Sequence, residues 1–198
     1  MTAAATPPSD DEPPAAARSS EPLPAESAAS VAAAMLWQPW MERALELAER
    51  AGREGEVPIG ALVVRRGELL GEGWNRSEAL LDPCAHAELL ALRRAAARSG
   101  NWRLTDATLV TTLEPCVMCF GALIEARIGL LVVGAGDSRR GAIDLWKAGH
   151  LSRYPVRPLA LIEGVLEGRC QKLLKDWFAV RRATGGGKTE DSNGQNWP

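Results

Sequence analysis

The chain has 198 residues, four cysteines and a formal net charge of −2, and it is long enough for one domain with its own core. Four unevenly spaced cysteines are too few for a small secreted module held together by disulfides, so we expect a reducing, cytoplasmic compartment. The sequence holds no run of eighteen apolar residues, and its N-terminus lacks a basic region followed by a leucine-rich one. We therefore expect neither a membrane span nor a secretory signal.

The two ends of the chain differ in composition from its centre. The first 36 residues hold twelve Ala, six Pro and five Ser without a hydrophobic period, and such a segment buries too little surface to offset the entropy of ordering. We expect a disordered extension over 1–36, one domain over 37–183 and a disordered polar tail over 184–198. Acids outnumber bases at both ends. The central domain is therefore mildly basic, which permits an anionic partner without requiring one.

The central block alternates between helical and strand periodicity. Apolar residues three and four apart predict an amphipathic helix over 40–53, and two apolar runs joined by a polar turn at 65–67 predict a β-hairpin. A helix over 86–100 ends at a glycine, a common C-terminal cap. Further strands are predicted at 106–113, 129–135 and 158–165, and further helices at 116–128 and 167–182. This alternation predicts a layered α/β domain in which helices cover a mixed sheet.

Two short segments carry residue types that bind metals: His86 and Glu88 lie in DPCAHAE, and Cys116 and Cys119 lie in EPCVMC. Cysteines three apart on a helix share a face, so both sulfurs can reach one ion. The positive end of a helix also favours the thiolate form that zinc binds. Two cysteines and His86 make three protein ligands, the number typical of a catalytic zinc. Taken alone, the cysteine pair also fits a structural zinc site, a redox pair or simple packing.

Glu88 is the candidate proton carrier. Zinc lowers the pKa of a bound water to about 7, and a carboxylate beside that water can accept its proton and pass it to a substrate. Positions two apart do not share a face of a regular helix. His86 and Glu88 can therefore face one ion only if the start of the helix holds them at different depths.

Other polar residues near these motifs have simpler interpretations. Cys84 is a candidate metal ligand, although a capping or packing role fits it better. Asn75 can close the hairpin as a turn residue. Arg181 and Arg182 can be the solvated end of a helix, where cations are favourable, and Cys170 is expected in the core.

HAE followed by 26 residues and then PCVMC resembles the pattern of the zinc-dependent nucleobase deaminases. Within them, EVPIGALVV, GEGWNR, DPCAHAE, NWRLTDATL, TLEPCVMC and EGVLEGRCQKLLKDWFAVRR are similar to segments of the bacterial tRNA adenosine deaminases, in the same order, over about residues 37–183. The resemblance implies a three-layer α/β/α cytidine deaminase-like fold with a central mixed sheet of about five strands. It also implies one Zn²⁺ per subunit, bound by His86, Cys116 and Cys119, with Glu88 as the proton shuttle.

The resemblance further implies a set of residues that contact the substrate. Asn75 matches an asparagine that contacts the purine ring, and the backbone N–H of Ala87 matches a group that orients the reacting oxygen. Asp137 matches an aspartate near the target ribose. The last helix is implied to approach the RNA with Phe178, Arg181 and Arg182, in a stretch that also includes Trp177.

The implied reaction is hydrolytic deamination of the wobble adenosine of a tRNA anticodon to inosine, with an arginine tRNA bearing an ACG anticodon as the expected substrate. An anticodon loop offers an unstacked base at low cost. The resemblance also implies a homodimer that acts on the anticodon stem-loop, and no DNA partner is expected. The alternatives are deamination of guanine or cytosine within the same superfamily and a silent RNA-binding subunit, which the presence of Glu88 argues against. Residues 138–155 depart from the glycine- and alanine-rich segment of the family, so their RNA contacts stay open.

Overall fold

The computed structural model describes residues 28–151 and 159–184. Most of the expected extension and tail lies outside the described residues, in 1–27 and 185–198, as does the short segment 152–158. The described ranges contain the predicted strands, except residue 158 at the start of the last one, and both metal-binding motifs.

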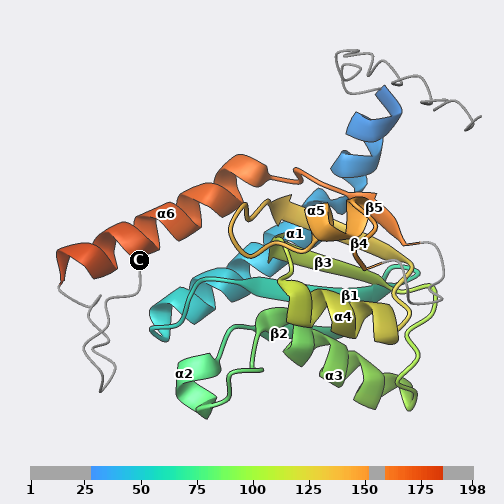
Figure 1. Ribbon diagram of the computed structural model, residues 1–198, viewed down its shortest axis with the longest axis horizontal. Coiled ribbons are helices and arrows are strands. Elements are labelled where there is room, and N and C mark those ends of the chain that lie inside the picture. Colours follow the sequence, from blue (N-terminus) through green and yellow to red (C-terminus); the bar gives the residue numbers. More distant parts are fainter. Residues whose placement is uncertain (1–27, 152–158, 185–198) are drawn as a thin grey trace, which may run out of the picture.

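The core of the fold is one mixed sheet of five strands in the order β2-β1-β3-β4-β5 (Figure 1). β1 pairs antiparallel with β2 and β3, whereas β3, β4 and β5 run parallel. The predicted hairpin is confirmed as β1 and β2, and the three later strands lie within their predicted ranges. The strands are β1 (Gly60–Arg65), β2 (Glu68–Trp74), β3 (Thr108–Leu113), β4 (Leu130–Ala135) and β5 (Ala160–Ile162).

Six helices are present in the described ranges: α1 (Ala28–Arg53), α2 (Ser77–Leu80), α3 (Ala87–Ser99), α4 (Val117–Glu125), α5 (Ile143–Lys147) and α6 (Glu167–Ala183). The prediction that the first helix begins at residue 40 was wrong, because alanine has the highest helix propensity and α1 continues upstream through an alanine-rich stretch. Residues 28–36 of the expected extension are therefore helical, and Figure 1 shows these turns projecting beyond the sheet. The short α2 and α5 were not predicted. None of these helices is long and apolar enough to cross a membrane.

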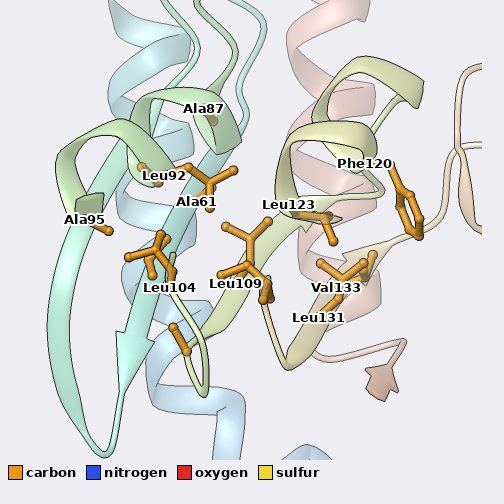
Figure 2. Close-up of a cluster of buried hydrophobic side chains, with 14 of the residues drawn as sticks. Ala61, Ala87, Leu92, Ala95, Leu104, Leu109, Phe120, Leu123, Leu131 and Val133 are labelled. Atoms are coloured by element: carbon orange, nitrogen blue, oxygen red, sulfur yellow. The ribbon is translucent and has the colours of Figure 1, made fainter. Parts of the chain in front are cut away.

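Alternate residues along the strands face opposite layers. Ala61 and Val63 of β1 belong to a core cluster with α3 and α4, whereas Leu62 and Val64 belong to a cluster with α1 and α6. This alternation follows from the two-residue repeat of a strand. Figure 2 shows the first cluster, in which side chains of α3, α4 and the strands meet between the helices and the sheet. The three-layer α/β/α arrangement expected from the sequence is confirmed.

Glycines allow helices to approach both faces of the sheet closely. A Cβ at Gly60 of β1 would collide with the backbone of Ala44 in α1, and a Cβ at Gly73 of β2 would collide with the carbonyl oxygen of Ala87 in α3. The same Cβ at Gly73 would lie 2.7 Å from the backbone nitrogen of Ala91, one turn further along α3. Because these contacts are with backbone atoms, which cannot move aside, the sheet fixes where α3 begins.

Candidate metal centre

The candidate metal ligands lie where two helices begin. His86 immediately precedes α3 and Cys116 immediately precedes α4, each with an extended backbone (φ −71°, ψ 152° and φ −69°, ψ 171°). Cys119 lies within the first turn of α4. The helix predicted over 116–128 is confirmed as α4, which begins one residue later, at Val117, because the extended backbone of Cys116 lies outside the helix. Both thiols remain at the positive end of the α4 dipole.

The spacing of the donor atoms fits a zinc ion. The ligand atoms of His86, Cys116 and Cys119 all lie within 4.8 Å of one another. Nδ1 of His86 lies 3.7 Å from Sγ of Cys116 and 3.5 Å from Sγ of Cys119. Tetrahedral zinc with bonds of about 2.3 Å to sulfur and about 2.0 Å to nitrogen separates those atoms by about 3.5 Å. Among the described residues this is the one group of histidine, cysteine and carboxylate donors close enough to hold a metal, and Cys84 is not part of it.

Hydrogen bonds among the donors favour a thiolate at Cys116. The thiol of Cys119 donates to Cys116 and, with His86, lowers the pKa of Cys116 to about 3. The same bond, together with burial, raises the pKa of Cys119. The hydrogen bond to Cys116 raises the pKa of His86. Since zinc binds two thiolates and a neutral imidazole, metal uptake at this site releases protons.

Glu88 is a buried carboxylate with an unpaired oxygen. It is the second residue of α3, only 4 % exposed, and its Oε2 atom has no hydrogen-bond partner within the described chain. Burial raises its pKa to about 7. The extended backbone of His86 places the two side chains at different depths at the start of α3, the arrangement the sequence required. An unpaired buried carboxylate oxygen is costly and is typical of a site completed by a substrate or water.

A pocket of about 350 Å³ opens beside the donor group. Its lining consists of Pro83, His86, Cys116, Val117, Met118 and Arg140. Arg140 is exposed, and its guanidinium has no ion-pair or hydrogen-bond partner among the residues that the structure describes. The pocket therefore combines two candidate metal ligands with an unpaired positive charge, which suits an anionic ligand.

Asn75, just after β2, and Ala87, at the start of α3, are both buried. Asn75 follows β2, is 6 % exposed, and donates from Nδ2 to Oε2 of Glu56 over 3.1 Å. The next residue, Arg76, donates its backbone N–H to the carbonyl oxygen of Ala85 over 3.0 Å. This bond ties the chain after Asn75 to the chain just before α3. Ala87 is fully buried as the first residue of α3, so its N–H has no acceptor inside the helix.

Asp137 lies in the loop after β4, where its carboxylate stabilises its own turn. Oδ1 accepts hydrogen bonds from the backbone N–H groups of Arg139 and Arg140 over 3.0 and 3.2 Å. Glu114, which follows β3, holds the same loop from the other side. Its two carboxylate oxygens accept the N–H groups of Asp137 and Ile143, each over 2.9 Å. The loop that carries Arg140 is therefore tied to the end of β3.

The residues predicted to contact RNA from the last helix lie on α6, whose one buried residue, Cys170, packs in the core cluster on the α1 side of the sheet. Phe178 is 39 % exposed and packs edge-on against Trp177, with 5.0 Å between ring centroids. Arg181 lies over the Trp177 ring at 4.8 Å and donates to the carbonyl oxygen of Gly55 over 2.8 Å. Arg182 is exposed. None of the three lines the pocket beside the metal ligands.

The sequence interpretation missed Glu56, Glu114 and Arg140. Glu56 opens the EVPIG segment and Glu114 directly precedes PCVMC. The one available signal was position, because each carboxylate adjoins a segment that the sequence already marked. Arg140 lies in 138–155, the segment that departs from the family pattern and whose RNA contacts the sequence leaves open.

Comparisons with known proteins agree with this geometry. Residues 36–135 match the model of the cytidine and deoxycytidylate deaminase zinc-binding region. The tRNA-specific adenosine deaminase of Haemophilus influenzae is 43% identical over 150 residues, which cover 72% of this chain and 83% of that protein. The corresponding protein of Buchnera aphidicola is 39% identical over 147 residues, covering 72% of this chain and 94% of that one.

Two solved structures extend the likeness to three dimensions. A chain from a study of A-to-I editing by tRNA:A34 deaminases superposes with a TM-score of 0.64 at 37% identity, covering 68% of this chain and 97% of that one. A guanine deaminase from Nitrosomonas europaea superposes with a TM-score of 0.58 at 29% identity, covering 70% and 82%. The expected cytidine deaminase-like fold is thereby confirmed. This chain belongs to the zinc-binding cytidine and deoxycytidylate deaminase family, in which the curated relatives named above are tRNA-specific adenosine deaminases.

Proposed function

We propose that this protein hydrolyses the wobble adenosine of a tRNA anticodon to inosine. The observation that carries the reaction type is the unpaired Oε2 atom of buried Glu88, which lies two residues after His86 in the three-donor group. The substrate follows from the relatives, which are tRNA-specific adenosine deaminases at about 40% identity over most of their length. A non-catalytic RNA-binding subunit would gain nothing from a buried carboxylate oxygen that lowers stability because it has no hydrogen-bond partner.

The chemistry assigns one role to each group. His86, Cys116 and Cys119 hold the zinc, which when bound supplies the Lewis acid that makes a water nucleophilic at neutral pH. Glu88 accepts a proton from the attacking water and delivers a proton to ring nitrogen N1 as the oxygen bonds to C6. Glu88 then takes the remaining proton from the oxygen on C6 and passes it to the amino group, and the C6–N bond breaks to release ammonia as the C6 carbonyl forms. Adenosine and water thus give inosine and ammonia.

Deamination of guanine is the second candidate, because the guanine deaminase of Nitrosomonas europaea shares the fold at 29% identity. The pocket favours the first candidate. Arg140 places an unpaired guanidinium on the lining, and a nucleic acid offers it a phosphate where a free base offers none. Asn75, the Ala87 N–H and Asp137 are proposed to contact the nucleotide itself, and Phe178, Arg181 and Arg182 the stem-loop.

The protein is further proposed to act as a homodimer. Val117 and Met118, at the start of α4, are 50 % and 37 % exposed. A mostly apolar hollow of about 260 Å³ lies along the same helix and includes Val117, Phe120 and Ile124 in its lining. A second copy of the chain covers this face in the proposal, which sedimentation of the purified protein tests. We assign the catalytic domain to residues 37–183 and its site of action to the cytoplasm, where tRNA is used in translation.

The deciding experiment incubates the purified, zinc-loaded protein with an arginine tRNA bearing an ACG anticodon, and separately with guanine, cytosine and adenosine. Inosine at the wobble position, read by sequencing, is the expected result. The same tRNA with a GCG anticodon is the matched control, because it lacks the adenosine. Consumption of guanine or cytosine with no inosine in the tRNA overturns the proposal.

A further inference from the structure

Glu56 is a buried carboxylate for which the proposed chemistry has no use. It is 2 % exposed and lies in the turn between α1 and β1. Three N–H groups point at it: Oε2 accepts from Nδ2 of Asn75 over 3.1 Å and from the backbone N–H of Glu78 over 3.3 Å, and Oε1 accepts from the N–H of Ala79 over 2.8 Å. A buried charge persists only where such bonds compensate for its desolvation.

We propose that Glu56 is a positioning residue that fixes the amide of Asn75 in one of its two orientations and so sets which atoms the base meets. A carboxylate only accepts hydrogen bonds. The Asn75 nitrogen must therefore face Glu56. The carbonyl oxygen of Asn75 accepts a long hydrogen bond from Oγ of Ser77 over 3.5 Å, and the second N–H is left in a fixed direction. The inference deepens the proposed function, since it rests on Asn75 contacting the nucleotide.

No neutral side chain reproduces this arrangement. Glutamine has the same shape but carries one donor nitrogen in place of an acceptor oxygen. If that nitrogen faces Ala79, two donors oppose each other. If it faces Asn75, it also opposes the Glu78 N–H, which shares that oxygen in the native protein, and the Asn75 amide must reverse, which exchanges the donor and the acceptor presented to the base. Glu56→Gln therefore loses a backbone bond in either orientation, and in the second it also loses the orientation of Asn75.

The turn that carries Glu56 is itself held in place. The backbone N–H of Glu56 donates to the carbonyl oxygen of Ala51 over 2.9 Å, and the guanidinium of Arg181 donates to the carbonyl oxygen of Gly55 over 2.8 Å. Arg181 in turn lies over Trp177 of α6. Because α1 and α6 both fix the turn, the carboxylate reaches Asn75 from a rigid support, as positioning requires.

Kinetics of Glu56→Gln, with Glu54→Gln as the matched control, test the proposal. Glu54 lies two residues upstream, is partly exposed, and accepts from Nε1 of Trp74 over 2.9 Å instead of from Asn75. With a zinc-loaded protein and an anticodon stem-loop, Glu56→Gln should raise KM about tenfold, the value of one misdirected hydrogen bond, and change kcat much less. Glu54→Gln should leave KM unchanged. A Glu56→Gln protein that is less stable but keeps the wild-type KM shows a merely structural role and overturns the proposal.

A reversed pair separates orientation from stability. In the double variant Glu56→Gln with Asn75→Asp, the glutamine nitrogen donates to the aspartate, so the pair forms with opposite polarity. The double variant should recover part of the melting temperature lost in Asn75→Asp, where two carboxylates meet, but not all of it, because the glutamine nitrogen faces the Glu78 N–H. Its KM should stay high, because the aspartate offers no N–H to the base. A double variant that regains the wild-type KM contradicts the proposal.

Side-chain NMR tests the inference independently of activity. In full-length ¹⁵N-labelled protein, the amide pair that disappears in Asn75→Asp identifies Asn75. Glu56→Gln should move those resonances and speed the exchange of their protons with water, whereas Glu54→Gln should not. Unmoved Asn75 signals in Glu56→Gln overturn the positioning role. An absence of inosine with the wild-type protein overturns the proposed function instead, and the NMR comparison still decides the role of Glu56.

Discussion

Glu88 and Glu56 are both buried carboxylates, yet their surroundings differ. Glu88 lies at the start of α3 with one oxygen unpaired, whereas Glu56 accepts three N–H groups. Glu114 resembles Glu56, since both of its oxygens accept backbone N–H groups. Hydrogen bonds to both oxygens offset the desolvation of Glu56 and Glu114, whereas Oε2 of Glu88 has no such bond. The contrast indicates two roles: Glu88 keeps one oxygen free for a reactant, whereas Glu56 and Glu114 stabilise the backbone segments whose N–H groups they accept.

The substitution expected to have the largest effect on activity is Glu88→Gln, which tests whether the unpaired carboxylate reacts. Loss of the proton carrier should lower kcat at least about 10³-fold, within the range of general acid–base catalysis. Since Glu88 contributes no ligand to the donor group, zinc content should stay at one per chain, and the melting temperature should not fall. Metal analysis, inosine formation and a thermal melt check the three expectations. A variant that loses its zinc would show that Glu88 is a ligand.

The same exchange at Glu114 should have the opposite result. Glu114→Gln replaces one acceptor with a donor that faces a backbone N–H, so the free energy of unfolding should fall by about 1–3 kcal/mol. The kcat should stay within about tenfold of wild type, because Glu114 contacts no reacting group. Urea unfolding and inosine formation measure the two effects. Unchanged stability would contradict a structural role for the hydrogen bonds of Glu114.

Arg140 extends the comparison to a charge that is exposed and unpaired. Arg140→Gln should weaken binding of the anticodon stem-loop about five- to tenfold at low salt, and the slope of log K against log salt should fall by about one. Turnover of free adenosine should not change, because the nucleoside carries no phosphate. Fluorescence anisotropy across a salt series gives the slope. An unchanged slope contradicts a phosphate contact.

The smallest effect is expected at Cys170, which lies on the other side of the sheet from the candidate metal centre. It is 1 % exposed in the α1 and α6 cluster, and burial raises its pKa to about 11 from an ordinary 9. The folded state disfavours the thiolate, so this contribution to stability is complete below pH 9 and is lost as the pH rises toward 11. The expected loss is about 1 kcal/mol at pH 10. Urea unfolding from pH 8 to 11 should show a shallower decline in Cys170→Ala than in wild type, and parallel curves would contradict it.

The fold could be predicted from the sequence to the extent that local pattern determined it. The strands and the helices α3, α4 and α6 follow from apolar spacing and from caps such as Gly100, which has the left-handed backbone of a helix end. The start of α1 could not be predicted, because an alanine-rich, proline-containing stretch without a hydrophobic period resembles disorder. The short α2 lacks any buried residue, so it leaves no periodicity to detect.

The residues of the candidate site could likewise be predicted only where a local motif marks them. The donor residues and Glu88 lie in two short motifs, and the likeness of those motifs to the nucleobase deaminase pattern drew them together. Glu56 and Glu114 bind backbone N–H groups more than twenty positions away, and a sequence carries no local sign of such a bond. Because charged residues are seldom fully buried, each glutamate on its own reads as a surface residue.

The close contact between Gly73 and α3 has a consequence for how the chain tolerates change. Because α3 packs directly on the backbone of β2 at Gly73, the helix cannot move closer to the sheet. The packing therefore fixes the position of the turn that carries Glu88. The depth of Glu88, the proposed proton carrier, is therefore set by a missing side chain on a neighbouring strand. Enlarging Gly73 by a single methyl group would shift the Glu88 carboxylate while every residue of the pocket kept its identity.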